Sequence, residues 1–130
     1  MFRLERLIPS ISYLTPLDQP FSDRRLVRWL LDALNSGDFT AFKAIVAFSK
    51  EAGLARLEAG LNSFRQRGGL AQIVLGVDLL GTSKQAIEFA LGNFDSAHVW
   101  HHPSLFTTFH PKLYLFEGPR KATATSAPTT

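Results

Sequence analysis

The residues best suited to chemistry are His110 and Lys112, which lie two positions apart in the run 108–117. This run is apolar and of β type, and side chains at i and i+2 of a strand point to the same face. An imidazole can attack phosphorus, and an adjacent ammonium can hold the negative charge of a phosphoryl group. The spacing predicts phosphoryl chemistry. The simpler alternative is two polar side chains at the end of a strand, with the ammonium of Lys112 reaching water.

The composition is that of an ordinary globular protein of about one domain. The chain has 130 residues, of which 45% are hydrophobic and 19% are charged, and it contains no cysteine. Disulfides and thiolate metal sites are therefore excluded. Residues 1–9 lack the apolar run and cleavage site of a secretory signal, so we expect a cytoplasmic protein. A net charge of +3 favours anionic partners only mildly.

Periodicity predicts an α/β fold with a mixed, largely parallel sheet and helices packed on it. We expect helices at 22–35, 51–66 and 82–91, and strands at 40–48, 71–77, 97–101, 110–117 and 121–125. No residues remain for helices between the last three strands, so these should include antiparallel neighbours. The expected organisation is an N-terminal arm or edge strand at 1–20, one domain at 21–126 and a frayed tail at 127–130.

Two of these elements carry more specific expectations. The run 41–48 is almost continuously apolar, which is typical of a strand covered on both faces. In the helix 22–35, one side carries the apolar residues Leu26, Trp29, Leu30, Ala33 and Leu34. The opposite side carries Arg24, Arg25 and Arg28, which predict a solvated helix face or, alternatively, contacts with a phosphate backbone.

A metal site is a weaker interpretation of the histidines. His98, His101 and His102 precede His110, but His98 and His101 should lie on opposite faces of a strand, which suits one ion poorly. We therefore expect no metal. A turn at 78–83, between a strand and a helix, stands where open α/β sheets bind anions, although it has no P-loop pattern.

At His110-Pro111-Lys112 the sequence resembles the phospholipase D superfamily, whose signature is H-x-K-x4-D followed several residues later by G-S-x-N. The resemblance is strongest to bacterial phospholipase D-like nuclease domains, in which a sequence like that of residues 109–116 is typical. The resemblance covers about residues 35–126 and implies a phospholipase D-like fold. Of its motifs, only H-x-K is specific.

The resemblance implies a phosphodiesterase, and most of all a metal-independent endonuclease that cuts DNA, or RNA, in a restriction or helicase-associated system. His110 would act as the nucleophile that forms a phosphohistidine, or as the general acid, and Lys112 would clamp the phosphate. No cofactor is needed. Because one chain supplies one H-x-K and the mechanism uses two histidines, we expect a homodimer, or pairing with a second phospholipase D-like half, and no membrane partner.

The sequence also departs from the family signature. Glu117 stands where the family has aspartate, and its strand parity is opposite to that of His110, so we expect a supporting catalytic role. Ser126 keeps the serine of G-S-x-N and would bind phosphate, but Pro128 replaces the asparagine. These departures leave open a truncated or catalytically degenerate module for nucleic-acid binding or dimerisation. An unrelated α/β domain with an accidental H-x-K is a third interpretation.

Overall fold

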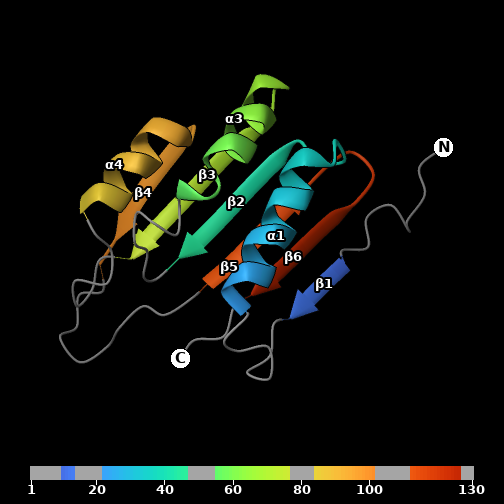
Figure 1. The fold of residues 1–130 in the computed structure, drawn as a ribbon, viewed down its shortest axis with the longest axis horizontal. Helices are drawn as coiled ribbons and strands as arrows, with labels where there is room; N and C mark the ends of the chain where they lie inside the picture. The colour runs from blue at the N-terminus through green and yellow to red at the C-terminus, as the bar shows by residue number, and fades with distance from the viewer. Residues whose placement is uncertain (1–9, 14–21, 47–54, 77–83, 102–111, 127–130) are drawn as a thin grey trace.

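The chain alternates helices with strands and then ends in two strands. The computed structural model describes residues 10–13, 22–46, 55–76, 84–101 and 112–126. The elements are β1 (Ser10–Tyr13), α1 (Ser22–Asn35), β2 (Ala41–Val46), α3 (Glu58–Gln66), β3 (Leu70–Gly76), α4 (Lys84–Asn93), β4 (Ser96–Trp100), β5 (Lys112–Glu117) and β6 (Ala122–Ser126). Figure 1 shows the helices side by side over a six-stranded sheet. The predicted α/β class is confirmed.

The direction of β5 distinguishes it from the other strands of the sheet. The strand order is β1-β6-β5-β2-β3-β4, and β5 is antiparallel to both of its neighbours. The remaining pairs, β1 with β6, β2 with β3 and β3 with β4, are parallel. We call the edge at which β2, β3, β4 and β6 end the carboxyl edge, and the opposite one the amino edge. Reversal makes β5 begin at the carboxyl edge, which confirms the predicted antiparallel neighbours.

All three described helices run against the parallel strands. α1 ends at Asn35 shortly before β2 starts, and α3 and α4 likewise end a few residues before β3 and β4. Because those strands start at the amino edge, each helix starts near the carboxyl edge, as Figure 1 shows. None of these helices combines the length and the apolar character needed to cross a membrane.

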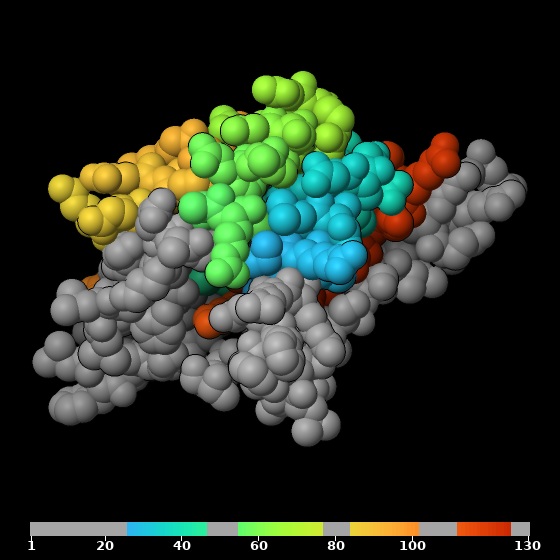
Figure 2. All heavy atoms as spheres, viewed as in Figure 1, coloured from blue at the N-terminus to red at the C-terminus, as the bar shows by residue number. Residues whose placement is uncertain are grey.

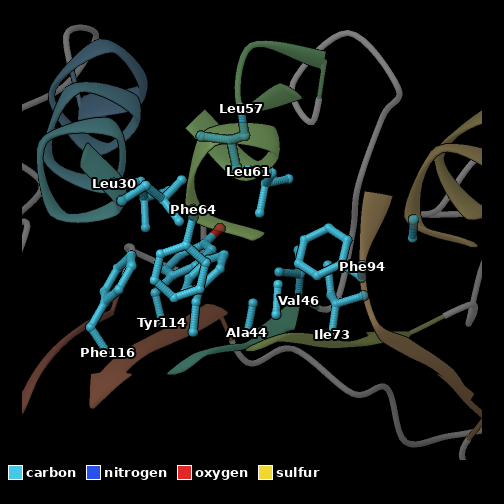
Figure 3. Packing of buried hydrophobic residues seen from close by; sticks show 14 of the residues in the cluster. Leu30, Ala44, Val46, Leu57, Leu61, Phe64, Ile73, Phe94, Tyr114 and Phe116 are labelled. Carbon is cyan, nitrogen blue, oxygen red and sulfur yellow. The ribbon is translucent and has the colours of Figure 1, made fainter. Parts of the chain in front are cut away.

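The core lies between the helix layer and one face of the sheet. Leu30 and Leu34 of α1 are buried, as predicted, and so are Leu61 and Phe64 of α3. Figure 3 shows Leu30, Leu61 and Phe64 in the space above the strands, and Figure 2 shows the helices covering the sheet from the same side. The Phe42 and Phe116 rings stack with centroids 4.5 Å apart, which joins β2 to β5 within the core.

The prediction that β2 is covered on both faces is wrong. Burial alternates along the strand: Phe42, Ala44 and Val46 are buried, whereas Lys43 is exposed and Ile45 is half-buried. The described helices lie over one face (Figure 1), and the side chains of Lys43 and Ile45 on the other face remain accessible. Alternation is the pattern of a strand with one face toward a core.

Most element boundaries agree with the sequence prediction to within a few residues. The helix 22–35 is observed as predicted, and the edge strand expected within residues 1–20 is β1. The regular part of α3 starts at Glu58 rather than Glu51, with a turn before it; residues 51–54 lie outside the described residues. The capping box at Thr82 and the turn at 78–83 also lie outside them.

Candidate active site

Lys112 lies at the carboxyl edge near the middle of the sheet. It is the first residue of β5 and is in register with Val46, the last residue of β2. Its side chain is half-buried and shares a face of the strand with Tyr114 and Phe116, which are buried beneath the helices. The ammonium group therefore lies on the helix side of the sheet, where the strand meets the carboxyl edge.

Lys112 has no ion pair or hydrogen bond to its side chain within the part of the chain that the structure describes. Lys43, on the neighbouring strand, is different: its Nζ lies 2.9 Å from Oε1 of Glu117. A half-buried cation without an anionic partner is a favourable position for an external anion, because binding then breaks no internal ion pair.

The helix layer adds positive potential to the same place. α1, α3 and α4 all start near the carboxyl edge, on the side of the sheet that Lys112 occupies. A helix N-terminus carries roughly half a positive charge and unpaired N–H groups. The cation and the three helix ends consequently favour negative charge along this edge, as open α/β sheets often do beyond the carboxyl ends of their strands.

The other predicted site residues have different locations. His110 lies outside the described residues. Ser126 ends β6 and its backbone is in register with Leu113, so it shares the carboxyl edge with Lys112. Glu117 is at the far end of β5, roughly 16 Å along the strand from Lys112 at about 3.3 Å per residue, and it points to the open face of the sheet. The structure thus brings Lys112 and Ser126 to one edge and leaves Glu117 at the other.

Two of the histidines that suggested a metal site, His98 and His101, lie within the described residues. His98 is exposed on β4, in register with Val74, and His101 is exposed just after that strand. Among the described residues, no group of three or more histidine, aspartate or glutamate side chains could hold an ion. His102 lies outside them.

Sequence reasoning missed two cations of this region, Arg56 and Lys84. Lys84 is the first residue of α4, and Arg56 lies in the turn before α3; both are exposed. A signal for them was present, since a parallel helix–strand alternation places every helix start at the carboxyl edge of the sheet. Any basic residue at a helix start was therefore a candidate neighbour of Lys112.

A scan against protein-family models finds no match to this chain, and a search of curated proteins finds none either.

Proposed function

We propose that the protein is a phosphodiesterase of the phospholipase D-like type, in which His110 and Lys112 act on the phosphate backbone of DNA without a metal ion. The observation that carries this proposal is the reversal of β5, which puts Lys112, the first residue of the strand, at the carboxyl edge. In open α/β sheets this edge is where ligands bind. Had β5 been parallel to β2, Lys112 would lie at the amino edge.

Each residue has a defined part in the proposed reaction. The imidazole of His110 attacks the phosphorus, so that a P–N bond forms while the P–O bond to the leaving group breaks. A second histidine donates a proton to the leaving oxygen, and water then cleaves the P–N bond and restores the imidazole. Lys112 stabilises the charge that develops on the non-bridging oxygens, and its lack of a partner among the described residues supports this role.

The second histidine is supplied by another copy of the chain, because a twofold axis places two identical motifs opposite each other. Activity per molecule should therefore rise with protein concentration in parallel with dimer formation. Sedimentation and turnover measured over the same concentration range test this coupling.

The decisive experiment measures hydrolysis of a DNA substrate and of a simple phosphodiester in excess EDTA. We expect turnover that survives chelation, disappears with His110→Ala and falls by a factor of about 10² to 10³ with Lys112→Ala. Lys121→Ala is the matched control, because it removes a lysine at the opposite edge of the sheet. Equal turnover of the Lys112 variant and the wild type would reject the proposed role.

Absence of turnover from well-folded protein would instead support a non-catalytic module for nucleic-acid binding or dimerisation. Glu117 favours that alternative, because its carboxylate is paired with Lys43 far from Lys112. Pro128, which stands in place of the asparagine, lies outside the described residues.

A further inference from the structure

Two exposed arginines of the helix layer have no partner among the described residues. Arg28 lies in the second turn of α1 and Arg56 in the turn just before α3, and both are exposed. Neither makes an ion pair or a hydrogen bond from its side chain in the described ranges. Both guanidinium groups are consequently available to an external anion without the loss of an internal contact.

The packing of α1 against α3 places these arginines on the same side of the contact between the two helices. The two helices run in the same direction, and Gly60 of α3 lies against α1: a Cβ at Gly60 would come within 2.8 Å of Leu31 and 3.2 Å of Leu34. Arg56 lies four residues before Gly60, in the turn that leads into α3, and Arg28 lies three residues before Leu31, so both arginines are on the carboxyl-edge side of this contact. Helices this close have axes about 8–10 Å apart, so the two cations flank one contact line.

Lys84 is a third exposed cation of the helix layer, on the helix next to α3. It is the first residue of α4, which packs against α3 on the side away from α1, and its side chain is 85% exposed. Among the described residues its Nζ pairs with Oε1 of Glu88 at 3.8 Å, a distance at which a surface pair contributes little. We call Arg28, Arg56 and Lys84 the basic row.

The basic row spans two helix spacings, or roughly 20 Å, along the surface beside Lys112. Phosphates of one nucleic-acid strand follow at about 3.4 Å of axial rise, so the row covers about six of them. A small phosphodiester reaches Lys112 alone, whereas a polynucleotide reaches the row as well. Acidic side chains lie nearby too, since Glu58 in the first turn of α3 and Asp32 of α1 are exposed.

We propose that the basic row binds the sugar–phosphate backbone of a polynucleotide outside the scissile phosphate. The inference rests on the proposed function and adds residues that hold the substrate rather than cleave it. A polynucleotide fits better than a lipid surface, because the exposed positions of α1 and α3 among the described residues are almost all polar and offer no apolar stripe for insertion.

The test is fluorescence anisotropy of a labelled 20-nucleotide single strand and its duplex, titrated with the full chain at several salt concentrations in EDTA. The variants are Arg28→Ala, Arg56→Ala, their double variant and Lys84→Ala. Arg120→Ala is the matched control, an exposed arginine at the amino edge that likewise has no described partner. Arg28→Lys with Arg56→Lys keeps the charge and checks that the alanine variants measure loss of positive charge rather than loss of the fold.

The double alanine variant should bind at least tenfold more weakly near 0.1 M salt, and the slope of log K against log salt should fall by about 1.4 to 1.8. The double lysine variant should retain most of the affinity, and Arg120→Ala all of it. Glu58→Gln should bind more tightly, by about two- to threefold, since it removes a negative charge two residues from Arg56. Unchanged affinity and slope in the double alanine variant, or an equal loss in Arg120→Ala, would overturn the proposal.

Failure of this proposal and failure of the proposed function give different results. Binding that depends on the row in a protein without hydrolytic activity supports the row and rejects the catalytic role. If the protein hydrolyses the simple phosphodiester but its affinity for DNA does not change in the Arg28 and Arg56 variants, the basic row is rejected and the catalytic role stands. Vesicles of phosphatidylglycerol are the competing probe: row-dependent binding to them and none to the oligonucleotides would overturn the choice of a polynucleotide.

Discussion

The described lysines and arginines near the amino edge and those near the carboxyl edge differ in whether they have internal partners. Toward the amino edge, every described lysine and arginine except Arg120 has an internal partner. Ion pairs or hydrogen bonds join Lys43 to Glu117, Arg65 to Asp95, Lys121 to Asp38, and Arg67 to the carbonyl oxygen of Leu34. Lys121 also lies 5.5 Å from the centre of the Phe39 ring. These cations tie together segments that are distant in the sequence.

Toward the carboxyl edge, the described cations have no comparable partners. Lys112, Arg28 and Arg56 lack them among the described residues, and Lys84 has only a loose contact. A paired charge contributes to the fold, whereas an unpaired one on the surface contributes little to stability and stays available to a ligand. The contrast gives the cations of the amino edge a structural role and supports the proposal that the carboxyl edge binds an anion, and each of the following predictions tests one side of it.

The largest expected effect is on turnover. Lys112→Ala should reduce kcat/KM for the simple phosphodiester by a factor of about 10² to 10³, because it removes charge stabilisation from the transition state. Lys43→Ala, which removes the neighbouring but paired lysine, should change kcat/KM less than twofold. Steady-state kinetics in EDTA, with circular dichroism as the check on folding, measures both. Comparable losses in the two variants would remove the distinction between the two halves.

The largest expected effect on stability is at the amino edge, at Gly118. A Cβ added there would overlap the carbonyl oxygen of Asp38, and the Cα of Phe39 would lie 3.1 Å away. Backbone atoms cannot move aside as a flexible side chain can, so Gly118→Ala should cost about 3 kcal/mol in urea unfolding. Gly92 in α4 has open space around it, and Gly92→Ala should stabilise by about 0.5–1 kcal/mol. A neutral result at Gly118 would show that this edge is loosely packed.

The relative directions of the last strands could be predicted from the sequence, but the coverage of the two faces of the sheet could not. The segment after residue 95 is too short for helices between its strands, and this alone predicted antiparallel neighbours, which β5 has. Apolar residues such as Ile45 and Ala41 occur on open and covered faces alike, so the run 41–48 did not reveal that one face of β2 is open. Lys43 within that run was the one opposing signal, because a lysine is rarely buried.

The candidate site could be predicted in part. His110 and Lys112 stood out by residue type and spacing, and the edge occupied by Lys112 follows from strand direction. The ion pair between Lys43 and Glu117 could not be predicted, because it depends on the register of two strands separated by about half of the chain. For the same reason, the sequence placed Glu117 beside the site by motif position, whereas the strand carries it to the opposite end.

A moderate stability effect is expected at Asp95. Its carboxylate accepts a hydrogen bond of 2.7 Å from the backbone N–H of Ala71 and lies 3.2 Å from Nη2 of Arg65. Since the ion pair is about one-third exposed, we expect Asp95→Ala to cost about 1–2 kcal/mol, mostly through the backbone hydrogen bond. Asp32→Ala, at an exposed position of α1, should cost less than about 0.5 kcal/mol. Equal costs at the two aspartates would contradict a structural role for the amino-edge pairs.

The smallest expected effect concerns Glu117 and decides whether it belongs to the site. Its ion pair with Lys43 is about half exposed on both sides, so Glu117→Gln should cost about 0.5 kcal/mol or less, and the difference should vanish near 1 M salt. Because Glu117 lies a full strand length from Lys112, turnover in EDTA should change less than twofold. A loss approaching that of Lys112→Ala would show that the carboxylate acts on the carboxyl edge through the strand, and would end the separation between a structural and a binding half.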